Sequence, residues 1–241
     1  MQAELESSLK PWQIFSGSWL KIIAVTTMLI DHLAAFYWGK MAPFQEVWFT
    51  IGHHSVTPYL ILRLIGRIAF PIFAFLIVEG FLHTHDRKRY GLNLLLFAFL
   101  SEIPFNLVHS GTWHYPVQNV FFTLFLGYLG LCAIEYYKDD GKRLLAALVG
   151  LLALSVLLRS DYGCSGYGFI LLLYALRKNK ILQAIIGSCV LWTRWVAGLA
   201  FIPINMYNGK RGFVKGPVAK YFFYLFYPLH LLIIYYLRKF L

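Results

Sequence analysis

Several ionisable residues lie inside long apolar runs of this sequence, where a charged side chain is costly. An ionisable group at the centre of a membrane span costs at least about 2.5–3.5 kcal/mol, and such groups are functional candidates by default. A structural role, as a buried ion pair or an interface anchor, stays open for each of them taken singly. They include Asp31, His32, Arg63, Arg67, Glu79, Glu102, Arg194 and His230.

His32 has the properties of a general base, because an imidazole titrates near neutral pH. Asp31 is its sequence neighbour, but adjacent residues of a helix point about 100° apart. We therefore expect Asp31 to raise the basicity of His32 either directly or by holding nearby arginines. Arg63 and Arg67 stand four residues apart on one helix face. Their like charges need a common anionic partner, which is Glu102, Asp31 or the phosphates of a ligand.

Lys21 and His32 are separated by ten residues, so eleven helical steps return to within about 20° of the same face, about 16.5 Å farther along the axis. A cation at one end and an imidazole at the other can hold the two ends of one long ligand, such as the phosphates and the thioester of a pantetheine carrier. The competing interpretation is that Lys21 anchors the span at the membrane surface and His32 pairs with Asp31.

Weaker candidates also stand out. His230 lies in the middle of a tyrosine-rich run and is either a core histidine or a ligand, and Asn119 lies where an apolar run begins. Lys210 and Arg211 belong to a short, crowded basic loop, which indicates a local role. His83 and His85 have no third ligand nearby, so no metal site is expected.

The composition indicates that these residues belong to a membrane protein, whose helices must position them. The 241 residues are 59% hydrophobic and 14% charged, with a mean hydropathy of +0.61. Soluble domains carry about 25% charged residues, and 18% aromatic residues exclude a disordered chain. No removable signal peptide is expected. We predict an all-α, polytopic membrane helical bundle formed by a single domain over residues 1–241, with residues 1–17 as a short cytoplasmic segment.

About eight apolar runs are long enough to be considered as spans. The fifth and sixth are short and flank a glycine-rich break, so they either cross fully or form a re-entrant hairpin. The runs cover residues 19–38, 58–82, 91–108, 120–137, 144–158, 166–176, 181–204 and 221–237.

Orientation follows from the positive-inside rule. Of the 22 Lys and Arg residues, 12 fall in the loops on the side of the N-terminus and 5 in the alternate loops. The count predicts that both termini are cytoplasmic and that the loop over residues 208–216 is outside. It also explains the net charge of +11 without nucleic acid. With this topology Asp31, His32, Arg63, Arg67 and Glu102 lie about 7–14 Å below the outer surface, which predicts a polar chamber in the outer half.

Seven ordered strings resemble the TraX family, whose namesake acetylates the N-terminus of conjugative pilin. The Lys21-x10-His32 spacing is also similar to an Arg/Lys-x10-His motif of membrane acyltransferases that O-acetylate surface polysaccharides, and to the first-span histidine of lysosomal heparan glucosaminide N-acetyltransferase. The strings cover residues 20–32, 63–81, 101–105, 118–123, 161–163, 207–212 and 224–230.

This resemblance implies an acetyl-CoA-dependent transmembrane acyltransferase of a bacterial-type inner membrane, with no metal. His32, with Asp31, is the implied catalytic group. The acceptor is an amine or hydroxyl of a small molecule, surface polymer or peptide at the outer side. The implied donor-binding residues are Lys21, Arg63, Arg67, Lys210 and Arg211, although the Arg-x3-Arg spacing departs from the Arg-x2-Arg of the polysaccharide enzymes. Further site candidates are Glu79, Glu102, Asn119, Asp161, Tyr162, Asn208 and His230.

Two other functions remain open. A secondary transporter or exporter would use intramembrane His, Asp and Arg as a proton relay, although the sequence shows no inverted repeat. A non-catalytic assembly factor for a surface structure is the third possibility, and binding of acetyl-CoA separates the first function from the other two.

Overall fold

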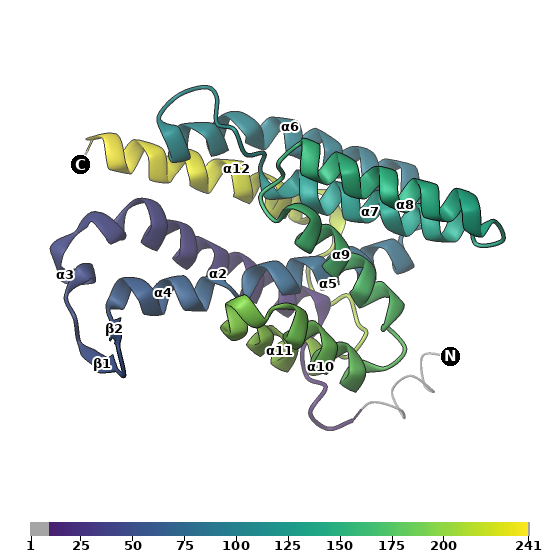
Figure 1. Cartoon of the computed structure of the whole chain (residues 1–241), viewed down its shortest axis with the longest axis horizontal. Helices are drawn as coiled ribbons and strands as arrows, with labels where there is room; N and C mark the ends of the chain where they lie inside the picture. The colour runs from purple at the N-terminus through teal and green to yellow at the C-terminus, as the bar shows by residue number, and fades with distance from the viewer. Residues whose placement is uncertain (1–9, 241) are drawn as a thin grey trace.

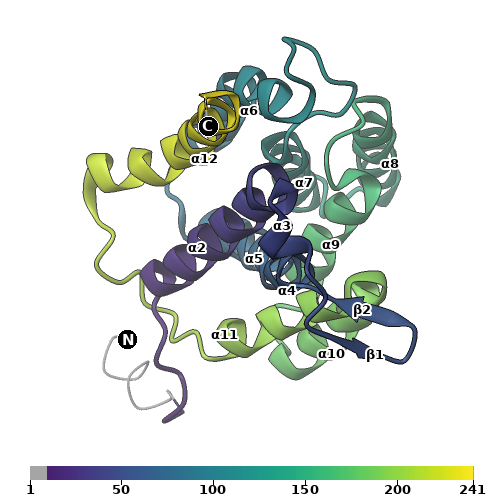
Figure 2. The same cartoon turned by 90° about the vertical axis from the view of Figure 1, so that its left-hand side faces the viewer.

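The computed structural model describes residues 10–240, with the backbone alone at residues 192–195. It is a helical bundle with one small two-stranded hairpin, and most of its long helices run roughly along one direction (Figure 1). Seen from the end, α2 lies between the α6–α12 pair on one side and α4, α5 and α9 on the other (Figure 2). The predicted helical bundle is confirmed, although the hairpin was not predicted.

The elements follow the predicted runs closely. They are α2 (Gly17–Phe36), η1 (Trp38–Lys40), α3 (Ala42–Gln45), β1 (Phe49–Ile51), β2 (His54–Val56), α4 (Pro58–Gly66), α5 (Ala69–His83), α6 (Arg87–Ser110), α7 (Val120–Tyr136), α8 (Gly141–Leu157), α9 (Gly163–Ala175), α10 (Lys180–Val190), η2 (Trp192–Ala200), α11 (Phe201–Asn205) and α12 (Gly216–Phe240).

Four segments of the described chain are long and apolar enough to cross a membrane: Gly17–Lys40, Pro58–His83, Arg87–Ser110 and Gly216–Phe240. The remaining apolar helices are shorter, at 17 residues or fewer. Of these, α8 lies at the edge of the bundle, and Ser155 is its one buried residue. Such a helix exposes apolar side chains all round, as expected where lipid is the solvent.

The second span is broken into two helices. Helix α4 ends at Gly66 and α5 begins at Ala69, with Arg67 in the turn between them. The cause lies in Pro71, which has no N–H to donate to the carbonyl four residues earlier, that of Arg67. Arg67 and Ile68 instead donate to the carbonyls of Leu64 and Ile65, three residues back. The break thus places Arg67 at the junction of two half-helices.

The predicted seventh span, residues 181–204, is not one continuous helix but folds back on itself. Helix α10 leads into η2 and α11, which pack back against it. Gly187 of α10 leaves room for Phe201 of the returning segment, and Gly198 of the returning segment leaves room for Ser188 of α10. The two ends meet where Lys180 Nζ donates to the carbonyl of Tyr207 at 3.3 Å. We call this segment the re-entrant hairpin. Helices α8 and α9, for which the sequence leaves the same alternative open, run antiparallel to each other beside α7.

This hairpin shows that the predicted topology is wrong. Loop residues 206–211 lie at the start of α2, where the amides of Gly17 and Ser18 donate to the carbonyls of Lys210 and Arg211 at 2.8 and 3.0 Å. Helices α2 and α12 then run in the same direction, and Arg238 near the end of α12 donates to Val108 near the end of α6. The two ends of the described chain therefore lie at opposite ends of the bundle, and loop 208–216 lies beside the N-terminal segment.

Candidate functional site

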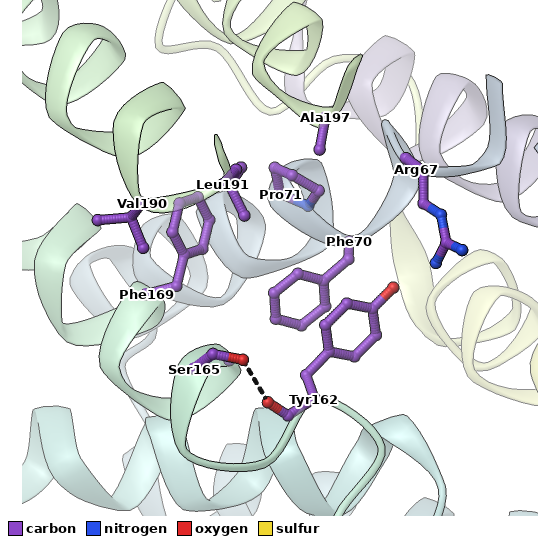
Figure 3. A pocket seen from close by; sticks show the side chains of 10 residues that line it. Arg67, Phe70, Pro71, Tyr162, Ser165, Phe169, Val190, Leu191 and Ala197 are labelled. Carbon is purple, nitrogen blue, oxygen red and sulfur yellow. Dashed lines mark hydrogen bonds between the residues drawn. The ribbon is translucent and has the colours of Figure 1, made fainter. Parts of the chain in front are cut away.

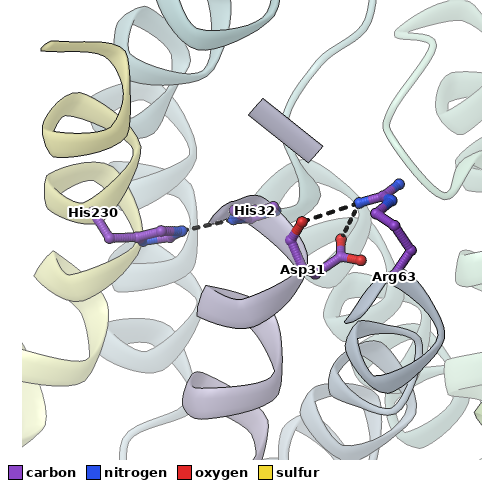
Figure 4. Close-up of polar contacts among 4 residues, drawn as sticks. All are labelled: Asp31, His32, Arg63 and His230. Atoms are coloured by element: carbon purple, nitrogen blue, oxygen red, sulfur yellow. Dashed lines mark hydrogen bonds and ion pairs between the residues drawn. The ribbon is translucent and has the colours of Figure 1, made fainter. Parts of the chain in front are cut away.

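The His32 side chain meets His230 between α2 and α12 (Figure 4). Their Nδ1 and Nε2 atoms are 2.6 Å apart, and the two rings are nearly parallel. His230 is buried, with 4% of its surface exposed, whereas His32 is only partly buried. The sequence offered both residues as rival bases, and the structure joins them in one contact.

The partners of this pair determine which ring nitrogens carry protons when both rings are neutral. His230 Nδ1 lies 2.7 Å from the backbone oxygen of Phe226. That oxygen can only accept, so Nδ1 of His230 carries the proton and Nε2 is the acceptor. His32 must then donate through Nδ1, which leaves its Nε2 with a lone pair. Within residues 10–240, no hydrogen bond to that lone pair is recorded.

Asp31 points to the other side of α2, towards α4 (Figure 4). Its Oδ2 lies 2.7 Å from Nη1 of Arg63, which also donates to the Asp31 backbone oxygen at 3.3 Å. A Cβ added at Gly66 would lie 2.2 Å from the Asp31 Cβ, so α4 approaches α2 closely because residue 66 is glycine. Of the anionic partners predicted for Arg63 and Arg67, Asp31 therefore forms an ion pair with Arg63.

Aromatic residues surround His32. The rings of Phe36 and Tyr227 lie 5.9 and 6.1 Å from it, and His109 packs on Phe36 at 4.6 Å. The sequence reasoning missed His109 and Tyr227. His109 follows the string at residues 101–105 by one helical turn, and Tyr227 stands three residues before His230, so helical spacing from known candidates would have found both.

Glu102 and Asn119 form a second polar contact at the start of α7. The Asn119 Nδ2 donates to Glu102 Oε2 at 2.6 Å and to the Ala98 oxygen at 2.8 Å. Its own Oδ1 accepts the Phe121 amide at 3.0 Å, as in an ordinary helix N-cap. Asn119 is fully buried. This contact ties α6 to α7, which is a structural role for a pair predicted as site candidates.

Asp161 and Tyr162 lie in the loop before α9, and both act electrostatically on Tyr227, as does Glu102. Tyr162 stacks on Phe70 of α5, with ring centroids 3.6 Å apart. Arg67 lines a cavity with Tyr162 and residues of the re-entrant hairpin (Figure 3). Together with Asp31, His32 and Arg63, these residues form the polar region expected in one half of the bundle.

Lys21 lies at the opposite end of α2, on the same side of the helix as His32, since both contact α12. Its ammonium group is 5.8 Å from the Phe223 ring, and the cations Arg211 and Lys220 act on it electrostatically. Lys210 is adjacent to Arg211 in the same loop, where Asn208 Oδ1 accepts the Lys210 amide at 2.9 Å. We call Lys21, Lys210, Arg211 and Lys220 the basic cluster.

Glu79 lies apart from the His32 region, near the base of the hairpin. It accepts a hydrogen bond from the Tyr207 hydroxyl and interacts with Lys180 and His83. Burial and the Glu79 carboxylate raise the pKa of the Tyr207 phenol above its usual range. Tyr207 also accepts from Gln13 Nε2 through its backbone oxygen at 3.1 Å. The Glu79 contacts therefore join α5, the hairpin and the N-terminal segment.

The remaining predictions concern Arg194 and the binding of a metal ion. The Arg194 side chain lies outside the described residues. In the described part of the chain, no group of three or more His, Cys, Asp or Glu residues is placed to hold a metal ion.

One family and one curated relative match most of this chain. No solved structure matches the chain. A protein of Dichelobacter nodosus, the probable fimbrial assembly protein FimC of serogroup H1, is 30% identical over 247 residues, covering 90% of this chain and 93% of that protein. The family described as TraX protein matches residues 16–238, a span that includes His32, Arg63, the basic cluster and His230. The chain therefore belongs to the TraX family.

Proposed function

We propose that this protein is an integral-membrane acetyltransferase that moves an acetyl group from cytoplasmic acetyl-CoA to an amine or hydroxyl at the outer side. The observation that carries the proposal is the α12-facing side of α2. It has a basic cluster at one end and, about 16.5 Å farther along the helix, a histidine whose Nε2 has a lone pair.

The proposal requires that the start of α2 faces the cytoplasm, and the corrected topology supports this orientation. With loop 208–216 beside the N-terminal segment, the end of the bundle that holds the start of α2 carries 13 Lys and Arg and the opposite end carries 4. The four are Lys40, Arg159, Arg238 and Lys239. The positive-inside rule then favours a cytoplasmic start of α2 and an outer end of α12. The basic cluster faces the compartment that contains acetyl-CoA.

The basic cluster fits the phosphates of the donor. Three cations, Lys21, Arg211 and Lys220, are brought together, and the charges that act on Lys21 within the described residues are both positive. Like charges so arranged favour an anion that neutralises them. The distance from Lys21 to His32 is of the order of an extended pantetheine arm. Arg63 already has Asp31 as its partner, so we place the phosphates at the cluster.

His32 supplies the base. Acetyl-CoA provides a thioester carbonyl that an amine or hydroxyl attacks, and the coenzyme A thiolate is the leaving group. His32 Nε2 takes the proton that the acceptor loses as the new bond forms, and that proton can pass on to the departing thiolate. His32 remains a donor to His230 through Nδ1 in both its neutral and its charged form. The His230 contact therefore needs no rearrangement during the transfer.

The acceptor is proposed to be part of a surface structure. The D. nodosus relative is named as a fimbrial assembly protein, which supports a peptide or polymer of the cell surface over a soluble metabolite. Together with the candidate spans, this supports the inner membrane of a bacterium as the location.

One observation favours transport as a second candidate. The broken α4–α5 helix and the re-entrant hairpin line one cavity, and interrupted helices are common at the binding sites of secondary transporters. Under that function His32 and His230 would carry protons without any covalent chemistry.

The deciding experiment uses membranes that contain the protein or its His32→Ala variant, incubated with acetyl-labelled acetyl-CoA. We expect a labelled product with the native chain and none with the variant. Calorimetry on the purified protein should show acetyl-CoA binding to both. Absence of binding to the native chain would contradict the acetyltransferase and leave transport.

A second experiment tests the orientation. Cysteines placed at Lys210 and at Lys239 should react with a membrane-impermeant maleimide from opposite sides, Lys210→Cys from the cytoplasm and Lys239→Cys from outside. Labelling of both from one side would contradict the re-entrant hairpin.

A further inference from the structure

A cavity of about 130 Å³ lies where the break between α4 and α5 meets α9 and the re-entrant hairpin (Figure 3). Aromatic rings of Phe70, Tyr162 and Phe169 form part of its wall, and Leu191 of the hairpin forms another part. Arg67 supplies its positive charge. The sequence reasoning placed Arg67 with Arg63 as a pair, but the break at Arg67 separates their surroundings.

Arg67 differs from Arg63 in its partners. Arg63 is paired with Asp31 at 2.7 Å, whereas no ion pair or hydrogen bond of the Arg67 side chain is recorded among the residues that the structure describes. Arg67 follows the start of α4 by nine residues, about 13.5 Å into the bundle. A cation at such depth is costly unless an anion compensates it. The cavity is where that anion can bind.

The size of the cavity limits the ligand. Sites for drug-sized ligands enclose about 300–1,000 Å³, so 130 Å³ is too small for the body of a coenzyme and suits one terminal group. One wall residue, Tyr162, acts electrostatically on Tyr227, and the ring of Tyr227 is 6.1 Å from that of the proposed base His32. A molecule anchored here can extend a neighbouring amine or hydroxyl towards His32.

We propose that the Arg67 cavity binds an anionic group, a carboxylate or a phosphate, carried by the acetyl acceptor. Assignment of the anion to the acceptor rests on the proposed acetyl transfer, whereas binding of an anion does not. The acceptor thus has a negative group close to the nucleophile that becomes acetylated.

Thiol modification tests the charge of the cavity without any activity. In a protein whose Cys132, Cys164 and Cys189 are replaced by serine, Ser165→Cys places one thiol at the cavity wall. Its reaction rates with anionic and cationic methanethiosulfonates of similar size are compared. Arg67→Gln should lower the anionic-to-cationic rate ratio by about tenfold, and Arg67→Lys should largely preserve it. Lys40→Gln, which removes a charge elsewhere at the same end of the bundle, is the matched control.

Ligand protection then identifies the anion. Acetate and inorganic phosphate are added separately, and the one that resembles the natural group should slow modification of Ser165→Cys in the native Arg67 background but not in Arg67→Gln. A neutral thiol reagent keeps the comparison independent of reagent charge. Val190→Cys on the hairpin gives a second reporter if Ser165→Cys does not fold.

Three results would overturn the proposal. A rate ratio that Arg67→Gln leaves unchanged would show that the guanidinium does not control the cavity. Failure of both anions to protect would show that the cavity binds neither. Protection by acetyl-CoA at micromolar concentration, lost in Arg67→Gln, would assign Arg67 to the donor. Since none of these measurements requires transfer, a failed acetylation assay with an Arg67-dependent charge ratio would count against the proposed function alone.

Discussion

The contacts of α2 with α12 and with α4 begin from adjacent residues, yet they hold their polar groups in different ways. Towards α4, Asp31 and Arg63 form an ion pair packed against Gly66, in which both charges are compensated within the protein. Towards α12, the His32 and His230 rings form a chain of neutral donors and acceptors that ends at the Phe226 carbonyl. In the first contact each charge has an opposite partner, whereas the second leaves His32 Nε2 with a lone pair.

The two contacts of α2 therefore have different roles, one structural and one chemical. A compensated ion pair fixes the approach of two helices, and removing one partner leaves an uncompensated charge. A histidine chain with one lone pair left over can accept a proton from a substrate. We therefore expect substitutions on the α12 side to change reactivity and those on the α4 side to change stability.

The largest effect is expected for His32→Ala. Loss of the general base should lower the rate of acetyl transfer by about 10²–10⁴-fold, while acetyl-CoA affinity measured by calorimetry stays near the native value. His109→Ala is the matched control, because His109 belongs to the same region but donates its Nδ1 proton to the Phe105 carbonyl and packs its ring on Phe36. Its loss should be less than about tenfold. A larger loss for His109→Ala than for His32→Ala would assign the base role to His109.

His230 should affect the rate through the tautomer of His32. His230→Leu removes the acceptor that holds the proton on Nδ1 of His32, so the reactive tautomer becomes less populated and the rate should fall by about tenfold or more. His230→Gln can still accept that proton through Oε1 and should recover most of the loss. Nitrogen NMR of labelled histidine should show a protonated Nδ1 at His32 in the native and Gln proteins. A protonated Nε2 in the native protein would contradict the chain of donors.

Gly66→Ala should weaken the α4 contact without altering the chemistry. The added methyl group would lie 2.2 Å from the Asp31 Cβ, and overpacking of this kind costs about 1–3 kcal/mol. Thermal unfolding in detergent should show a lower midpoint. Gly150→Ala in α8 is the control, because nothing lies within 4 Å of the position of its Cβ. If Gly66→Ala left the midpoint unchanged but abolished transfer, the distinction between the two contacts would fail.

The smallest effect is expected at the other end of the α12-facing side. Lys21→Gln removes one of several cations that meet the donor, so its affinity should fall by about fivefold, or ~1 kcal/mol. The rate at saturating acetyl-CoA should remain near native. Lys40→Gln at the opposite end of the bundle should leave affinity unchanged. Equal affinities of the Lys21→Gln and native proteins at low salt would remove Lys21 from the proposed donor site.

The sequence by itself determined the class of protein, the limits of most helices and the residues worth testing. Apolar runs and their interruptions are local features, so α2, α6, α7 and α12 were predictable to within a few residues. Spacing along one helix placed Lys21 and His32 on the same side, and the 100° step correctly separated Asp31 from His32. The family followed from ordered strings of residues and is confirmed by the match over residues 16–238.

Tertiary structure decided which residues meet. The contact of His32 with His230 spans 198 positions, and no local spacing indicates it. The return of residues 181–204 depends on Gly187 and Gly198 fitting Phe201 and Ser188, while an apolar run of that length looks like a crossing in the sequence alone. That one hairpin reversed the direction of α12 relative to the predicted topology. It moved Lys210 and Arg211 from the predicted outer side to the end of Lys21, because only packing between helices distinguishes a crossing from a return.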